Sequence, residues 1–259
     1  MPNHRVAVVT GATRNSGYAI AERFAKEGYD VVITSRSLPD IEKATAALRK
    51  DYPESLVYGV QMDPAVVDDI KNAFADIDSY FSQIDVFVSN AAHQGMKMNL
   101  FNTLPADFDA VINTNLRGSF YGCQEAVKRM HAGSAICLIS SLHARISMPD
   151  RIVYCASKGA LNSLMRACAV ELGHLGIRIN SLVAGAIWSE RWERITDDER
   201  QRRRNQYPCG RESKPEDIAN AVYFLCSDQS ATMTGSEMTV DSGFSACHDP
   251  YDKNWRPEI

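Results

Sequence analysis

The stretch "VAVVTGATRNSGYAIA", residues 6–21, joins a short apolar run to a turn with glycines and then to a segment with helical spacing. A short run rich in Val is typical of a buried strand, and apolar residues three and four apart are typical of a helix face. Between them, Gly11 and Gly17 allow close approach of the backbone to a bound group, and a helix N-terminus presents free N–H groups to an anion. The stretch predicts a strand–turn–helix unit, with either a phosphate site or ordinary turn chemistry.

The same alternation of short apolar runs and longer helix-compatible segments continues to the end of the chain. Further strands are predicted within residues 30–36, 56–63, 84–92, 134–141, 177–185 and 237–243. Among the helices, one is expected to end at Gly28, one to begin near Pro39 and one to begin at Pro215. Strands that are apolar on both faces suit a parallel sheet covered by helices. We therefore expect one α/β domain over residues 1–259, a three-layer, doubly wound parallel sheet of about seven strands, Rossmann-like.

Composition excludes several classes of function. The 259 residues carry a net charge of −4, so neither nucleic acid nor an acidic membrane surface is an expected partner. The apolar runs are shorter than a membrane span and the N-terminus lacks the apolar core of a signal peptide, which predicts a cytoplasmic protein. Seven cysteines and six histidines show no disulfide or metal-ligand spacing, so no metal site is expected.

The segment "YCASK" places Tyr154 and Lys158 one helical turn apart on one face. A cation close to a phenol favours the phenolate and lowers its pKa, which would make Tyr154 a usable proton donor and acceptor. Ser141 ends a predicted strand thirteen residues earlier, where its hydroxyl could stabilise developing charge. Taken alone, the pair could also be a packed tyrosine and a surface lysine.

These motifs, in this order and spacing, resemble the short-chain dehydrogenase/reductase family over residues 5–245. The family pattern T-G-x-x-x-G-x-G is matched at Thr10, Gly11 and Gly17, with Asn15 in place of the middle glycine. Asn tolerates left-handed backbone better than other residues with a side chain, so we expect the turn to survive. The N-L-x-G motif is matched at Asn115, in a long predicted helix.

The resemblance implies a catalytic set of four residues: Asn115, Ser141, Tyr154 and Lys158. In this family, hydride passes between a nicotinamide and a carbonyl carbon, while the tyrosine exchanges a proton with the carbonyl oxygen. The implied roles are polarisation of the substrate oxygen for Ser141, and lowering of the Tyr154 pKa and ribose binding for Lys158. Asn115 would support a proton relay, although it could also simply bond a neighbouring turn. A sensor that binds dinucleotide without turnover remains the rival reading, disfavoured because the set is intact.

The implied cofactor is NADP(H). Ser35 stands where NAD-preferring members carry an acid, Arg36 follows it, and Arg14 can reach the same phosphate. Both arginines could instead be solvated surface charges. The resemblance places these residues round the cofactor: Gly11, Thr13, Arg14, Asn15, Ser16, Gly17, Ser35, Arg36, Asp63, Asn90, Ala91, Tyr154, Lys158, Gly185, Ile187 and Ser189.

One predicted cofactor residue has a second interpretation, and one predicted cofactor loop departs from the family pattern. Asp63 with Pro64 is either an adenine contact, a helix N-cap followed by an N1 proline, or both. Ala184 replaces a family proline, so the nicotinamide loop depends on backbone near Ile187.

Residues 184–214 interrupt the strand–helix alternation and are predicted to form a lid. Substrate contacts are expected from five residues beside the site: His93, Gln94, His143, Trp188 and Trp192. They favour a polar, sugar-like or hydroxylated ketone, with a 3-oxoacyl thioester, a steroid or a cyclic ketone as alternatives. The tryptophans could equally pack the lid, and the arginine-rich run at residues 199–206 either attracts an anion or forms a solvated helix face.

The C-terminal tail, residues 246–259, extends beyond the family core. It carries Tyr251 and Trp255, and aromatic residues in a tail suggest that it docks on a surface. We expect it to pack against a neighbouring subunit or near an active site in a homotetramer, as is common in this family.

Overall fold

A computed structural model describes residues 4–247 of the chain. The predicted docking of Tyr251 and Trp255 lies outside these residues. The strands are β1 Val6–Thr10, β2 Asp30–Ser35, β3 Val57–Gln61, β4 Val86–Ser89, β5 Ala135–Ser141, β6 Arg178–Ala184 and β7 Glu237–Val240. The helices are α1 Asn15–Lys26, α2 Leu38–Asp51, α3 Val67–Ile77, α4 Pro105–Ile112, α5 Gly118–Val127, α6 Ile152–Leu172, α7 Asp197–Arg204 and α8 Pro215–Cys226.

All seven strands form one parallel sheet in the order β3-β2-β1-β4-β5-β6-β7. The chain builds outward from β1 to β3, then returns to the other side of β1 and builds outward again from β4. This reversal between β1 and β4 is where doubly wound sheets bind ligands, at the carboxyl ends of the strands. The predicted fold class is confirmed, and each predicted strand is present.

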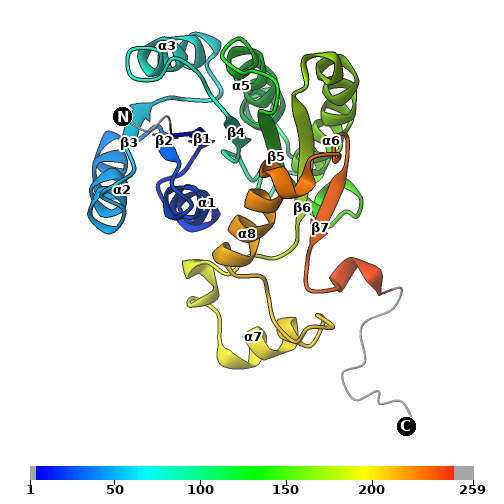
Figure 1. Cartoon of the computed structure of the whole chain (residues 1–259). Coiled ribbons are helices and arrows are strands. Elements are labelled where there is room, and N and C mark those ends of the chain that lie inside the picture. The colour runs from blue at the N-terminus through cyan, green and yellow to red at the C-terminus, as the bar shows by residue number, and fades with distance from the viewer. Residues whose placement is uncertain (1–3, 248–259) are drawn as a thin grey trace.

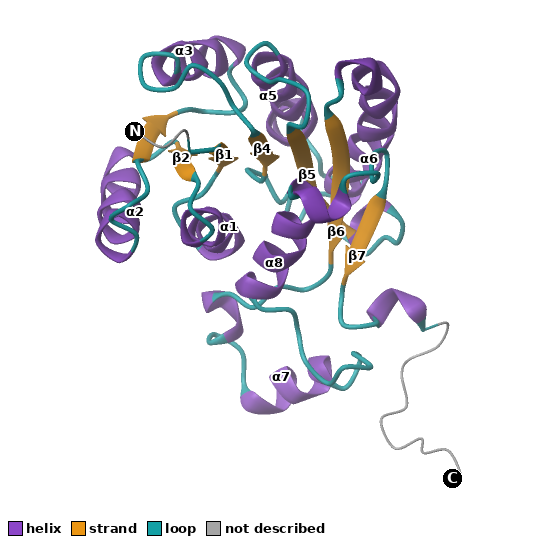
Figure 2. Cartoon of the chain, in the orientation of Figure 1, coloured by secondary structure: helices purple, strands orange, loops and turns teal. Residues whose placement is uncertain are grey.

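Helices cover both faces of the sheet, as Figures 1 and 2 show. On one face, α1, α2 and α8 pack through Phe24, Leu48 and Val222. On the other, α3, α5 and α6 pack through residues such as Phe74 and Leu161. Neighbouring strand residues point to opposite faces, so a strand between two helical layers must be apolar throughout. This explains the continuous apolar runs in the sequence.

The helix boundaries follow the expected capping chemistry with one exception. Gly28 lies one residue beyond the C-cap of α1 at φ +81°, and the backbone N–H of Asp40 bonds the Ser37 hydroxyl at the start of α2. The alternative in which Asp63 is a helix N-cap followed by an N1 proline is not met, which leaves the adenine contact as the role expected of Asp63. The Asp63 carboxylate instead accepts a bond from the Ala65 N–H at 2.9 Å, which makes a local turn, and α3 starts only at Val67.

The long helix predicted around Asn115 is interrupted. A π-helical turn, Asn113–Arg117, separates α4 from α5. Such turns are inserted where a side chain must be re-aimed, often at functional sites. Asn115 lies at the centre of this turn and is buried.

The lid segment, residues 184–214, contains more regular structure than the sequence indicated. It includes a short 3-10 helix, Glu190–Trp192, and then α7, and it lies beyond the end of α8 in Figure 1. Its two ends are joined by a parallel bridge between Ile187 and Ser213. Within residues 4–247, no helix has the length and apolar character to cross a membrane, and no group of three or more potential ligands is arranged for a metal ion.

Candidate active site

The turn after β1 is shaped for close backbone approach. Gly11 has φ +63°, and a Cβ there would lie 2.9 Å from Ala91 Cα. A Cβ on Gly17 would collide with the Gly11 carbonyl oxygen and lie 2.6 Å from Asn90 Nδ2. Asn15 adopts φ +49°, so it takes the left-handed conformation that its family counterpart glycine would take. The turn keeps its path despite the substitution.

Asn90 fastens this turn to the end of β4. Its Nδ2 donates to the carbonyl oxygens of Thr10 and Gly11, at 2.9 and 3.1 Å, and its Oδ1 accepts from the Ser16 hydroxyl at 3.3 Å. The Thr10 hydroxyl in turn accepts from the N–H groups of Asn90 and Ala91, both at 3.0 Å. The amide of Asn90 is thus used to hold the turn, a supporting role that the sequence did not indicate.

The N-terminus of α1 and two arginines could hold a phosphate group. Arg14 is the N-cap residue of α1, and no side chain of the described residues caps that helix end. Arg14 and Arg36 are both exposed, and neither has an acidic partner within residues 4–247. Arg36 lines a hollow of about 390 Å³ together with Gln61, Asp63, Asp69 and Asn72. The glycine turn and the start of α1 thus fit the phosphates of a dinucleotide, whereas the hollow beside Arg36 is lined by two carboxylates as well.

Lys158 occupies the buried interior between α6 and β5. It is 3% exposed, and its Nζ donates to the Ile139 carbonyl oxygen at 2.7 Å. Burial disfavours the ammonium and lowers the pKa of Lys158 to about 8. An ammonium has three donors, so this group can still bind hydroxyls such as those of a ribose.

Tyr154 lies one turn before Lys158 and beside Ser141. Burial raises the pKa of the Tyr154 phenol, while the Ser141 hydroxyl and the charge of Arg151 act in the lowering direction. Lys158 Nζ lies 5.7 Å from the centre of the Tyr154 ring and points to Ile139 instead. The predicted lowering of the Tyr154 pKa by Lys158 is therefore wrong for this arrangement, because desolvation outweighs the charges nearby.

Asn115 connects three parts of the site. Its Oδ1 accepts from the His93 N–H at 2.7 Å, and its Nδ2 donates to the His93 carbonyl at 2.9 Å and to the Ser157 hydroxyl at 3.0 Å. The π-helical turn thus holds the loop after β4 against α6. These bonds support the alternative in which the Asn115 side chain bonds a neighbouring segment. The backbone carbonyl of Asn115 accepts a separate bond from the Ser119 hydroxyl.

The predicted substrate residues are not equivalent in the structure. The His143 ring lies edge-on to Tyr154 at 5.9 Å, and the pKa of His143 is lowered first by burial and then by the charge of Arg151. Gln94 is exposed on the loop after β4. Trp188 is partly buried, whereas Trp192 is only 7% exposed and its Nε1 donates to the Ile187 carbonyl at 3.2 Å. Trp192 follows the packing alternative: it anchors the lid.

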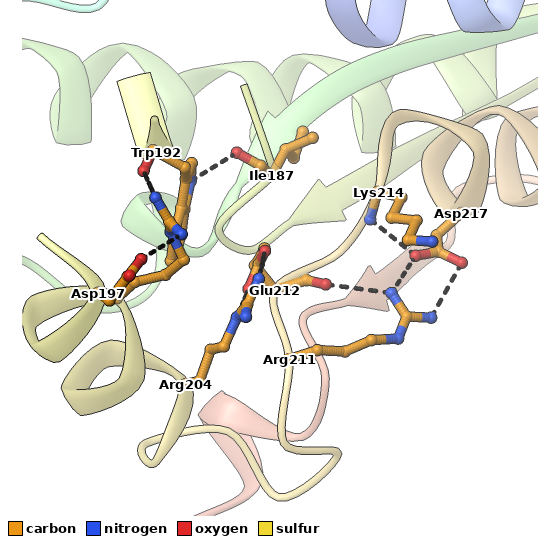
Figure 3. A network of polar contacts seen from close by, with 9 residues as sticks. Ile187, Trp192, Asp197, Arg204, Arg211, Glu212, Lys214 and Asp217 are labelled. Atoms are coloured by element: carbon orange, nitrogen blue, oxygen red, sulfur yellow. Dashed lines mark hydrogen bonds and ion pairs between the residues drawn. The ribbon is translucent and has the colours of Figure 1, made fainter. Parts of the chain in front are cut away.

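The arginines of α7 pair with acidic residues of the lid, among them Arg204 with Glu212 (Figure 3). Arg204 forms two bonds with the Glu212 carboxylate, at 2.8 and 2.7 Å, and Arg200 donates to the Trp192 carbonyl and to Asp197. On α7, Arg202 and Arg203 both pair with Glu199. The arginine-rich run is therefore neutralised within the lid, which agrees with the solvated-helix alternative rather than an anion site.

The remaining predicted cofactor residues gather at the same end of the sheet. A Cβ on Gly185 would lie 2.8 Å from Asp241 Cα, so the loop that follows β6 approaches the segment that follows β7 closely. Ser189 precedes the 3-10 helix of the lid, Ser35 ends β2, and Thr13 lies in the glycine turn.

Two arginines beside the site were missed from the sequence. Arg151, the N-cap of α6, donates to the Gln94 carbonyl at 2.6 Å, and Arg191 of the lid donates to Gln94 Oε1 at 2.7 Å. Arg151 lies only three residues before Tyr154, which was an available signal. Arg191 is 97 residues from Gln94, and only the tertiary structure joins them.

Comparison with known proteins finds a matching family model and related oxidoreductases. A family model described as Enoyl-(Acyl carrier protein) reductase matches residues 11–245. The 3-oxoacyl-(acyl-carrier-protein) reductase FabG of Staphylococcus aureus is 32% identical over 240 residues, covering 92% of this chain and 96% of that protein. Glucose 1-dehydrogenase 2 of Bacillus subtilis is 29% identical over 245 residues, covering 93% and 95%.

A solved structure of a related enzyme resembles this chain over most of its length. A doubly substituted short-chain dehydrogenase/reductase of Serratia marcescens matches with a TM-score of 0.87 at 29% identity, covering 95% of this chain and 100% of that one. The predicted family resemblance is confirmed by the family model, the curated relatives and this structure together. The chain belongs to the short-chain dehydrogenase/reductase family of oxidoreductases.

Proposed function

We propose that this oxidoreductase interconverts a carbonyl and an alcohol with NADP(H), using Tyr154 as general acid and base. The observation that carries the proposal is the meeting of Ser141, Tyr154 and Lys158 at the carboxyl end of β5, on the same sheet edge as the Gly11–Gly17 cradle. A non-catalytic dinucleotide sensor would have no use for this set of side chains.

A bound nicotinamide supplies or accepts the hydride at the reacting carbon. The Ser141 hydroxyl donates to the substrate oxygen and stabilises the charge that develops there. Tyr154 gives its phenolic proton to that oxygen during reduction and takes it back during oxidation. Lys158 binds the ribose with the donors that Ile139 leaves free, and Asn115 holds the loop after β4 in place.

The test of this mechanism is the variant Tyr154→Phe, assayed on a panel of ketones with both nicotinamide cofactors. Removal of the proton donor is expected to lower kcat by about 10²–10⁴-fold. Tyr207→Phe is the matched control, because Tyr207 is also buried but packs on Phe244 in the lid region. Equal turnover by wild type and Tyr154→Phe would refute the mechanism, and turnover by neither would favour the sensor.

The preference for NADP(H) is proposed from Arg14 and Arg36. Their exposure without acidic partners suits a 2′-phosphate, and the guanidinium group binds phosphate in a bidentate manner. Arg36→Ala is expected to weaken NADPH binding by about tenfold or more and to leave NADH binding nearly unchanged. Lys43→Ala, an exposed change on α2, controls for net charge. Equal affinities of the wild type for NADPH and NADH would contradict the assignment.

A polar, sugar-like or hydroxylated ketone is the proposed substrate class. His143 beside Tyr154 and the exposed amide of Gln94 can bond hydroxyl groups, and a relative that is 29% identical is named as a glucose dehydrogenase. The alternative of a 3-oxoacyl thioester is supported by the name of the 32% identical relative. A screen of sugars, polyols and acyl thioesters, read by nicotinamide absorbance, separates the two.

A homo-oligomer, with a tetramer favoured, is also proposed. A surface hollow of about 310 Å³ is lined by Ile112, Leu116, Arg117, Phe120 and Leu164, on the face made by α4, α5 and α6. Phe120 is 43% exposed and Val170 of α6 is 84% exposed. Exposed apolar patches of this kind mark interfaces. Light scattering of the full chain tests the proposal, and a monomer would contradict it.

Cytoplasmic location is proposed as well. All seven cysteines are free, three of them buried in the core, which suits a reducing compartment. Cell fractionation with an antibody to the chain would check it, and recovery from an oxidising compartment would contradict it.

A further inference from the structure

Two arginines from separate elements contact the same residue of the loop after β4. Arg151 stands at the start of α6 and Arg191 in the lid, and both donate to the same residue, Gln94. Arg151 donates to the backbone carbonyl of Gln94, and Arg191 donates to the side-chain oxygen of Gln94. The loop after β4, the lid and the helix that carries Tyr154 are therefore tied together by two cations.

Neither cation is neutralised by a carboxylate. Within residues 4–247, no Asp or Glu lies within ion-pair distance of Arg151 or Arg191. Five lid arginines further along the chain do have such partners, namely Arg200, Arg202, Arg203, Arg204 and Arg211, whereas Arg194 has none among the described residues. A guanidinium has five N–H donors. The bonds to Gln94 use one donor of each arginine, and Arg191 Nη1 also donates to Met96 Sδ at 3.6 Å. The remaining donors can receive an anion.

The positive charge reaches the reacting centre. The Arg151 guanidinium carbon lies 6.0 Å from the centre of the Tyr154 ring. Its charge acts to lower the pKa of the Tyr154 phenol and of His143, although burial dominates for both. An anionic group bound by Arg151 would thus lie close to the carbon that reacts.

We propose that the substrate is a compact oxo or hydroxy carboxylate, whose carboxylate is bound by Arg151 and Arg191. The inference rests on the proposed function and narrows its substrate to an acid. The guanidinium fork matches the planar carboxylate, and both arginines contact Gln94. The 6.0 Å from the Arg151 guanidinium carbon to the centre of the Tyr154 ring favours a carboxylate only a few bonds from the reacting carbon. The carboxylate takes no part in the redox step. Arg151 and Arg191 determine specificity by orienting the substrate.

Paired substrates test the charge directly: 2-oxo and 3-oxo carboxylates, each beside its neutral methyl ester. The wild type is expected to show a kcat/KM about tenfold or more higher for the acid than for the ester. Arg151→Gln and Arg191→Gln should each reduce this acid-to-ester ratio by about tenfold, mainly through a higher KM for the acid. Arg151→Lys should recover part of the ratio, because it keeps the charge without the planar fork.

Arg194→Gln serves as the matched control for net charge, because Arg194 is an exposed lid residue that no described acid pairs with. It should leave the ratio unchanged. Thermal unfolding of each variant establishes that it folds, and Arg191→Gln provides the decisive arm should Arg151→Gln prove unstable, because Arg191 is exposed.

Three outcomes overturn the inference: equal kcat/KM for acid and ester in the wild type, a ratio untouched by both substitutions, or preference for a phosphorylated ketone over the carboxylates. In each of these cases ketone turnover that depends on Tyr154 would leave the proposed function standing. Failure of the proposed function has a different signature, namely the same rates for wild type and Tyr154→Phe on acid and ester alike.

Discussion

The reacting centre and the lid both depend on charged side chains, yet they use them in opposite ways. In the centre, Lys158 is buried with one carbonyl partner, and its pKa is lowered to about 8 by burial. In the lid, Glu212 is equally buried, with 5% of its side chain exposed, but it holds two bonds from Arg204, which keep its pKa below the usual range.

This difference distinguishes a charged group that can bind a ligand from one that only stabilises the folded chain. A buried charge without a counter-charge costs stability, and it is retained where a ligand will use it. A buried charge with a bidentate partner has its bonding capacity filled and can only hold structure. By this criterion Lys158 is available to a ligand, while Glu212 and its partner Arg204 are not.

The largest effect is expected from Lys158→Met, which keeps the length of the side chain and removes the charge. Turnover should fall by about 10²-fold or more, because the ammonium proposed to position the cofactor ribose is lost. The free energy of unfolding of the wild type should increase as the pH rises, whereas a lysine in a salt bridge would make it decrease. The unfolded chain binds the proton more tightly, with a pKa of 10.5 against about 8 in the fold, so wild-type stability rises between these pH values.

The expected rise is roughly 3 kcal/mol, and Lys158→Met should lack it. Denaturant unfolding of the cofactor-free protein between pH 7 and pH 10.5 measures the difference. Lys43→Met, an exposed lysine on α2, should track the wild type. Parallel curves for wild type and Lys158→Met would mean that Lys158 has an ordinary pKa in the fold.

A smaller, local effect is expected from Glu212→Gln. The change leaves Arg204 without its charged partner, which should destabilise the lid by about 1–3 kcal/mol. Amide hydrogen exchange should accelerate across residues 190–212 and KM should rise more than kcat falls, since the centre is untouched. In the wild type this contribution is present above the ordinary carboxylate range and is lost as the pH falls through the lowered pKa.

Glu199→Gln gives the smallest expected effect and serves as the control for the lid. Glu199 pairs with Arg202 and Arg203 on the solvent side of α7, and exposed ion pairs contribute little. No measurable change in lid exchange or in KM is expected. If Glu199→Gln and Glu212→Gln had equal effects, burial would not be what distinguishes the two pairs.

The fold was predictable because its signal is local. Short apolar runs, glycine turns and helix caps can each be identified from a few neighbouring residues. Their alternation along the chain indicates a parallel sheet covered by helices. Two local readings failed. The bond from Ala65 to Asp63 delays α3 until Val67, and a π-helical turn interrupts the helix at Asn115. Both depend on which partner a polar side chain finds in the folded chain.

The candidate site was predictable in its members but not in its electrostatics. Tyr154, Lys158 and Ser141 were identified by spacing, and the structure brings them together. The direction of the Tyr154 pKa was not predictable, since it is decided by burial and by the turning of Lys158 towards Ile139. Trp192 was assigned to substrate, but its burial places it in the lid.

The sequence by itself determined the order of strands and helices, the glycine cradle and the spacing of the reacting residues, because these are written in neighbouring positions. Only the tertiary structure decided which charges are left for a ligand. Arg191 meets Gln94 across 97 residues, and Arg204 meets Glu212 within the lid. The i,i+3 and i,i+4 pairs of α7 follow from helix spacing, but pairing across longer separations depends on what the fold brings within about 4 Å of an arginine.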